Sequence, residues 1–172
     1  ALPGNQDDKL KKSQEKAFKA ANLLKKLHKR LKTDYGKSWR QDLDEFLFNS
    51  EQEVVEAFSL FAIINQEQIP TRDISFRFQH PDSYKMVKTT IQVSERAYVF
   101  GLLDCIGELK RVILDSMNRN DFDFSRKVYE QMQDLFGKLE IFTEYSNSVS
   151  DLKPKIDAAR HILNDTKKIL DK

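Results

Sequence analysis

Residues 99–111 read VFGLLDCIGELKR, and this stretch sets the fold because it carries two contrasting faces at helical spacing. Its apolar residues and the next in the series are Leu102, Ile106, Leu109 and Ile113. A spacing of three or four predicts a helix that buries one side. We expect this helix to run from about Ile91 to Met117.

The opposite face of the same helix carries two carboxylates, Asp104 and Glu108, four residues apart. That spacing puts both side chains on one side of a helix. Gly101 stands on this side as well. Glycine is a poor helix former, so its presence predicts close approach of another backbone or of a ligand. In the alternative interpretation, Asp104, Glu108 and Asp115 form the solvated face of an amphipathic helix.

A second acidic pair, Glu53 and Glu56, lies in residues 51–57, EQEVVEA. In a helix predicted from about Ser38 to Glu67, this pair continues an apolar row rather than a polar side. Charges in such a row must be paired, bind a metal or lose their charge. If the two pairs face each other, the four acids form a site for a hard divalent cation, able to act on phosphate.

The remaining pattern predicts an all-α fold, a bundle of about five to six mostly long antiparallel helices in one domain over residues 1–172. The other helices are expected over about Asp8–Thr33, from Asp121 or Asp123 to Ser146, and onward from Ser150. Tyr35-Gly36-Lys37 breaks the first of them. The segment Thr71–Thr90, with His80, Pro81, Tyr84 and Lys85, has no convincing strand. We interpret it as a connection with a short helical turn after Thr71.

Charge is distributed unevenly along the 172 residues, whose formal net charge is +2. Residues 9–32 hold ten Lys or Arg against Glu15, so this segment carries +9 and the rest of the chain −7. A basic segment on an acidic protein suits a polyanion such as nucleic acid. The residues expected to contact it are Lys25, Lys26, Lys29 and Arg30. A solvated helix face rich in lysine explains the same pattern equally well.

Several functional classes are excluded by missing residues. The single Cys105 rules out a disulfide framework and a cysteine zinc site, and it is expected to be an ordinary buried thiol. The longest apolar stretch, residues 54–64, is too short to span a bilayer, so a cytoplasmic protein is expected. No phosphate-binding glycine loop, H-E-x-x-H or G-x-S-x-G occurs.

The chain resembles the translin family, most closely its catalytic branch, the Trax subunits. The resemblance is carried by residues 51–57 and 99–111 and by residues 115–123, DSMNRNDFD, and it covers nearly the whole chain. Asn120 stands where the family prefers glycine, and asparagine accepts a positive φ. Family members have a further helix before the point where this chain begins, which fits a truncated or minimal archaeal-type version.

The resemblance implies an all-helical subunit of a ribonuclease. Its four catalytic and metal-binding acids match Glu53, Glu56, Asp104 and Glu108, a set that translin itself does not keep. It implies Mg²⁺ (with Mn²⁺ possible) as cofactor and mainly single-stranded RNA as substrate. It also implies a closed, shell-like oligomer of identical subunits or with a translin-like partner. Arg111 lies one turn after Glu108, where it either contacts the scissile phosphate or forms a salt bridge to Glu108 or Asp115.

Two other classes remain as alternatives. In a non-catalytic helical scaffold that binds RNA or DNA, the acids are structural, and binding is salt-sensitive without cleavage. A di-iron carboxylate oxidoreductase also uses paired acids on a helical bundle, but that design needs Glu-x-x-His motifs. Neither acidic pair here brings a histidine.

Overall fold

The computed structural model describes residues 4–79 and 86–171, and the side chains of residues 12–76 and 88–171. Within these ranges the chain forms five α-helices and one antiparallel pair of strands. The helices are α1 (Gly4–Tyr35), α2 (Trp39–Ile64), α3 (Glu95–Met117), α4 (Phe122–Glu140) and α5 (Leu152–Leu170), and the strands are β1 (Asp73–Gln79) and β2 (Met86–Gln92). Short 3₁₀ segments, η1 (Gly36–Ser38) and η2 (Ile141–Tyr145), follow α1 and α4.

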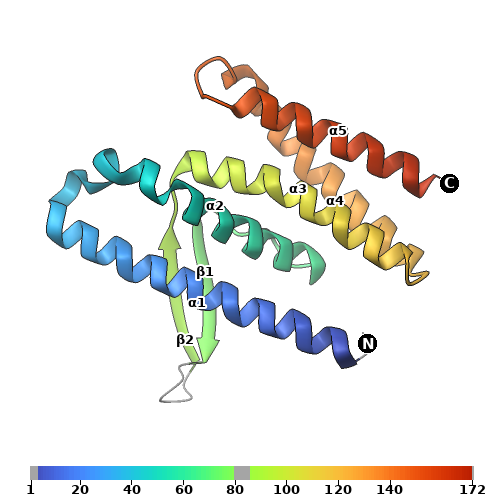
Figure 1. The fold of residues 1–172 in the computed structure, drawn as a ribbon, viewed down its shortest axis with the longest axis horizontal. Helices are drawn as coiled ribbons and strands as arrows, with labels where there is room; N and C mark the ends of the chain where they lie inside the picture. The colour runs from blue at the N-terminus through green and yellow to red at the C-terminus, as the bar shows by residue number, and fades with distance from the viewer. Residues whose placement is uncertain (1–3, 80–85, 172) are drawn as a thin grey trace.

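Helix α3 lies at the centre of the bundle (Figure 1). It contacts α2 on one side and α4 and α5 on the other, while α1 packs on α2. The apolar stripe expected on α3 is buried, with Leu102 at 5% exposure and Ile106, Leu109 and Ile113 at 0%. The predicted helical bundle is therefore confirmed. No helix in residues 4–79 or 86–171 combines the length and apolarity needed to cross a membrane.

The prediction that residues 71–90 contain no strand is wrong. β1 and β2 pair antiparallel, with Ile74 opposite Ile91 and Phe76 opposite Thr89. These four side chains are buried, whereas Ser75 and its partner on β2 are exposed. The alternation of period two was the available signal, and it outweighs the irregular composition.

The hairpin also changes where α3 begins. Residues 91 and 92 belong to β2, so α3 starts at Glu95 rather than at Ile91. Ser94 is the N-cap, and its hydroxyl accepts a hydrogen bond from the backbone N–H of Ala97 at 3.3 Å. The expected helical turn after Thr71 is absent, since β1 starts at Asp73. Residues 80–85, which include His80, Pro81, Tyr84 and Lys85, lie outside the described residues.

Most other boundaries follow from local chemistry. Gly36 has φ +73°, a left-handed conformation that glycine adopts without strain, and α1 ends there as predicted. Asn120 has φ +63°, and the Asp121 side chain caps α4 by accepting from the N–H of Phe124. Helix α4 ends at Glu140, before the predicted Ser146, and continues as η2. Asp151, rather than the predicted Ser150, occupies the N-cap of α5.

Gly101 marks a point where α3 approaches α2 closely. A Cβ atom at this position would lie 2.6 Å from the backbone oxygen of Gln52 and 2.7 Å from the Cβ of Val55. Both distances are shorter than van der Waals contact, and neither neighbour is the flexible end of a long side chain. The close backbone approach predicted for Gly101 is therefore present, and it brings the two acid-bearing helices together.

We expect Gly101→Ala to destabilise the fold by about 1–3 kcal/mol, because the new methyl group forces α2 and α3 apart. The matched control is Gly107→Ala on the same helix. A Cβ there meets nothing within 4 Å, so the higher helix propensity of alanine should stabilise the protein by about 0.5–1 kcal/mol. Urea unfolding of both variants measures the two effects. Equal changes in unfolding free energy for the two variants would contradict the close approach of α2 to α3 at Gly101.

Candidate functional site

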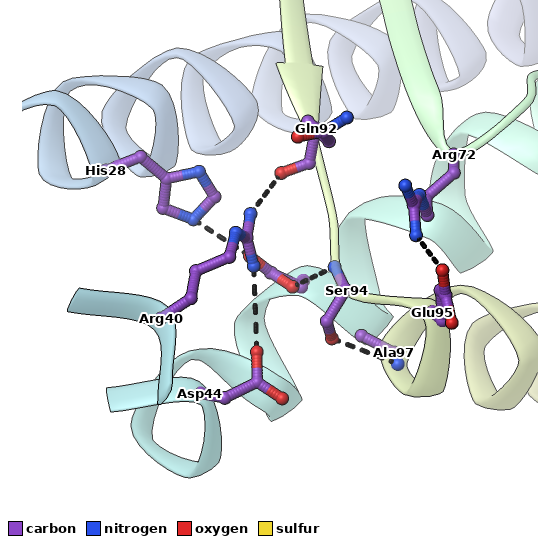
Figure 2. Close-up of polar contacts among 9 residues, drawn as sticks. His28, Arg40, Asp44, Arg72, Gln92, Ser94, Glu95 and Ala97 are labelled. Atoms are coloured by element: carbon purple, nitrogen blue, oxygen red, sulfur yellow. Dashed lines mark hydrogen bonds and ion pairs between the residues drawn. The ribbon is translucent and has the colours of Figure 1, made fainter. Parts of the chain in front are cut away.

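A buried carboxylate, Glu51, fixes α2 against the start of α3. Its side chain is completely buried, with Oε1 2.9 Å from Nε2 of His28 on α1 and 3.0 Å from Nη1 of Arg40. The backbone N–H of Ser94 donates to Oε2 at 2.7 Å, and Arg40 also donates to the carbonyl oxygen of Gln92. Figure 2 shows His28, Arg40, Gln92 and Ser94 converging at this point. One carboxylate thus connects α1, α2 and the junction between β2 and α3.

The pKa of Glu51 reflects these contacts. Burial by itself raises the pKa, but the contacts with His28, with the N–H of Ser94 and with the Arg40 guanidinium outweigh it and hold the pKa below its ordinary value. Glu51 therefore carries its charge in the folded protein. Since Glu51 lies on α2 five residues before Glu56, its bond to Ser94 fixes how far α2 is shifted along α3. That relative shift determines which acids meet.

The predicted acidic pairs lie on α2 and α3, two helices that pack against each other. Burial and, in decreasing order, the negative charges of Glu53, Asp104 and Glu108 together raise the pKa of Glu56 from 4.5 to about 7, while Lys155 opposes the rise. These contributions show that all four carboxylates share one electrostatic environment. Glu56, Asp104 and Glu108 are partly buried, whereas Glu53 is exposed. Glu53, Asp104 and Glu108 are therefore near enough to Glu56 to affect its charge, and whether the four acids form one site stays a prediction.

Cys105, next to Asp104, lies in the same acidic environment. The thiol is completely buried, and burial raises its pKa well above the ordinary range, with further contributions from Glu56, Glu108 and Asp104. A thiol with a raised pKa stays protonated and is a poor nucleophile. Cys105 is thus an ordinary buried thiol, as its sequence context predicted.

Two of the four carboxylates, Asp104 and Glu108, have cationic or amide partners. Lys155 of α5 donates to Oδ1 of Asp104, and the Gln52 side-chain amide donates to Oδ2. Oε1 of Glu108 lies 2.9 Å from Nη1 of Arg111. Of the two interpretations of Arg111, the structure therefore shows the salt bridge to Glu108.

The donor chemistry fits a hard divalent cation. Carboxylates are the ligands that Mg²⁺ and Mn²⁺ prefer. The pKa of Glu56 is raised by burial and, after it, by the neighbouring negative charges, and a bound cation would offset both effects. Over residues 4–79 and 86–171, however, no three Asp, Glu, His or Cys side chains stand close enough together to hold an ion. Asp104 and Glu108 face their protein partners instead. Metal binding would require these side chains to turn.

Glu53 also belongs to a second feature, a groove of about 660 Å³ between α1 and α2. Lys16, Leu23 and Leu27 of α1 line it together with Glu53. Leu23 is 65% exposed and Leu27 is 44% exposed. Glu53 therefore lies at the boundary between the acidic site and the basic helix.

The predicted nucleic-acid contacts lie on α1, in residues 25–30. Lys25 donates to the hydroxyl of Thr89 on β2, and Arg30 lies 3.4 Å from Asp34. Lys26 and Lys29 are exposed. Exposed lysines on α1 are expected both for a solvated helix face and for a surface that binds RNA. The role of these side chains in binding RNA therefore stays a prediction.

Sequence reasoning missed two residues at the site, Lys155 and Gln52. Lys155 follows Pro154 in the first turns of α5, where nothing local distinguishes it from the other lysines of that helix. Its contact with Asp104 depends on α5 packing against α3. Gln52 precedes Glu53, and its amide orientation could not be read from spacing. Only the packing of the helices reveals both contacts.

We expect the high pKa of Glu56 to make the metal-free protein lose stability as pH rises. The unfolded chain ionises near 4.5, the folded chain only near 7, so the folded state binds more protons between these values and stability falls across this window. Glu56→Gln removes the ionisable group and with it the loss of stability that ionisation of Glu56 causes. After allowance for solvent screening, the variant should gain on the order of 1 kcal/mol over wild type at pH 8 relative to pH 5 in EDTA. Urea unfolding at both pH values measures the stability difference between the variant and wild type. A difference that is the same at pH 5 and pH 8 would contradict the raised pKa of Glu56.

Several solved structures have a fold similar to that of this chain. The crystal structure of AfC3PO superposes with a TM-score of 0.64 at 24% identity, covering 94% of this chain and 83% of that chain. The AfC3PO–duplex RNA complex gives 0.58 at 20% identity, with coverage of 96% and 91%. Apo-NeC3PO gives 0.53 at 18% identity, with coverage of 99% and 97%. At these identities the likeness shows the fold.

Sequence comparison is more specific. An uncharacterized protein of Methanocaldococcus jannaschii is 29% identical over 174 residues, which covers 91% of this chain and 71% of that protein. The family model for the Translin family matches residues 3–169. The chain belongs to the translin family.

Proposed function

We propose that this protein is a Trax-like, divalent-metal-dependent endoribonuclease subunit that hydrolyses phosphodiester bonds of mainly single-stranded RNA. The observation that carries the proposal is the close approach of α2 and α3 at Gly101, the two helices that bear Glu53, Glu56, Asp104 and Glu108. The raised pKa of Glu56, caused by burial and by the charges of the other three acids, supports it. Clustered, partly buried acids are typical of sites that act on a charged ligand.

Each part of the chain has a role in this proposal. Glu53, Glu56, Asp104 and Glu108 would hold one or two Mg²⁺ or Mn²⁺ ions, which supply Lewis-acid polarisation and a lower pKa for bound water. Glu56 must be ionised to act as a ligand, so binding at neutral pH releases a proton. The network around Glu51 keeps α2 and α3 in register, and Gly101 permits their close approach.

RNA would be bound by the basic surface of α1. Lys26 and Lys29 are exposed there and offer sequence-independent contacts to phosphates. A structurally similar protein has been solved as a complex with duplex RNA, which supports RNA as the ligand of this fold. The assembly we propose is the closed oligomer that the resemblance to the translin family implies, either of identical subunits or with a translin-like partner.

The test is cleavage of end-labelled RNA by the purified protein in Mg²⁺, in Mn²⁺ and in excess EDTA, with single-stranded and duplex substrates of the same sequence. We expect the single strand to be cut internally in either metal and to stay intact in EDTA. Cleavage that persists in EDTA would disprove the metal site. Cutting of the duplex at an equal rate would disprove the strand preference.

The same samples address the alternative function, a non-catalytic RNA-binding scaffold. The exposed lysines of α1 favour it independently of the acids. A scaffold would retard RNA in a gel shift at low salt, release it at high salt, and leave its length unchanged in every metal.

A further inference from the structure

Lys155 is the cation that reaches the acidic site from another helix. It stands in the second turn of α5, and its ammonium pairs with Oδ1 of Asp104 on α3. The side chains are 28% and 30% exposed, so the pair is largely removed from solvent. The same nitrogen lies 5.3 Å from the centre of the Phe100 ring, and its charge lowers the pKa of Glu56. Lys155 therefore interacts with acids of both α2 and α3.

The other cation at the site has a different character. Arg111 lies on α3 itself, pairs with Glu108 three residues earlier, and is 76% exposed. Such local surface pairs contribute little. Lys155 instead joins α5 to α3, because it pairs with a residue 51 positions earlier in the sequence, and it lies against the Phe100 ring, which excludes water. It stands where a cation lowers the repulsion among the carboxylates.

We propose that Lys155 is a tethered counter-ion, which neutralises the acidic cluster in the metal-free protein and must leave Asp104 before a divalent cation can bind there. The inference rests on the proposed metal site and adds to it a residue that sets metal affinity. Lys155 acts as a positioning residue, since it touches an acid of the site rather than substrate. Its four-carbon stem and partial exposure leave room for the ammonium to move into solvent.

The physical consequence is a competition for one carboxylate. Asp104 cannot give Oδ1 to both an ammonium and a metal, and a metal that displaces Lys155 must overcome their ion pair. Removing the ammonium should therefore tighten metal binding. We expect Lys155→Met, which keeps most of the apolar stem, to bind Mn²⁺ roughly tenfold more tightly than wild type. Lys155→Arg keeps the charge and should bind Mn²⁺ with nearly wild-type affinity.

The experiment is a titration of Mn²⁺ into the full chain without RNA, with free Mn²⁺ followed by electron paramagnetic resonance at about pH 8.5. Lys153→Met is the matched control, since it removes one exposed lysine of the same helix and changes net charge equally. It should alter the affinity by less than about twofold. An equal affinity of Lys155→Met and Lys153→Met, or a weaker one for Lys155→Met, overturns the proposal.

A second measurement needs no substitution of Lys155. Acetylation of wild type followed by mass spectrometry reports how accessible each lysine is. We expect Lys155 to be labelled several-fold faster with saturating Mn²⁺, and faster without metal in Asp104→Asn, while Lys153 is labelled at one rate throughout. If the acetylation rate of Lys155 is the same with and without Mn²⁺, the proposal that Mn²⁺ displaces Lys155 from Asp104 is wrong.

The outcomes separate this inference from the proposed function. If wild type binds Mn²⁺ and cuts RNA, but the affinity of Lys155→Met and the labelling of Lys155 do not change, only the counter-ion role fails. If wild type, Lys155→Met and Lys153→Met all fail to bind Mn²⁺, the metal site fails and the proposed function falls with it.

Discussion

Asp104→Asn should lower the rate of metal-dependent RNA cleavage by at least about a hundredfold while leaving the fold intact. Asp104 stands between the two helices, in contact with Lys155 and Gln52 and close enough to Glu56 to raise its pKa. An amide has the same shape but lacks the charge that a cation requires. The measurement is single-turnover cleavage of labelled single-stranded RNA in Mg²⁺, with far-UV circular dichroism to verify helix content.

The matched control for this experiment is Asp115→Asn. It makes the same chemical change on the same helix, three turns further on, at an exposed position with no part in the cluster. Its cleavage rate should stay within about twofold of wild type. RNA affinity, measured by gel shift in EDTA, should be similar in all three proteins, because the basic surface lies on α1. Full cleavage by Asp104→Asn would remove the nuclease proposal, whereas loss of RNA binding would indicate a damaged fold.

The largest effect on stability is expected from Glu51→Gln. Its completely buried carboxylate neutralises Arg40, contacts His28 and accepts the backbone N–H of Ser94. Breaking a fully buried ion pair costs about 3–5 kcal/mol. Arg40 is 28% exposed and keeps Asp44 as a second partner at 3.6 Å, so the cost here lies at the lower end of that range. We expect a loss of about 3 kcal/mol, measured by urea unfolding at pH 7. Since the contact to Ser94 sets the position of α3 against α2, cleavage should fall too.

Glu45→Gln is the control for that substitution. Glu45 also pairs with an arginine, at 3.0 Å from Arg96, but its side chain is 80% exposed. Screening by water limits such a pair to less than about 1 kcal/mol. A loss as large as that of Glu51→Gln would show that burial is not what distinguishes the two pairs.

The pH dependence gives a further test of Glu51. Its pKa is held below the ordinary carboxyl value, so the folded state binds fewer protons than the unfolded chain. The stabilisation is present above the unfolded pKa and is lost as pH falls through the folded pKa. The stability difference between wild type and Glu51→Gln should therefore shrink in acid, below about pH 4. A difference that grows in acid would mean that Glu51 is protonated in the native protein.

Much of the site was predictable from the sequence because helix geometry is local. A spacing of three puts Glu53 and Glu56 on one side of a helix, and a spacing of four does the same for Asp104 and Glu108. Gly101 signalled that another backbone lies near, and Gln52 and Val55 are that neighbour. What these acids do chemically stays a prediction.

The hairpin and Glu51 were harder to anticipate. Each strand of the hairpin has seven residues, and strand pairing is stabilised by contacts across the sheet rather than within one segment. Glu51 stands beside the predicted acids and has the same side chain as Glu53, yet it is buried in an ion-pair network. Residue type and spacing could not separate these two roles.

The sequence by itself determined that the chain is a helical bundle, that its acids lie in two pairs, and that the first helix is broken at Tyr35-Gly36-Lys37. These features depend on spacing and backbone conformation within a few residues. Only the tertiary structure decided that Lys155 lies against Asp104 and that Glu51 holds the start of α3. Those contacts join distant segments, and they form only where packing of the apolar faces brings the helices into register.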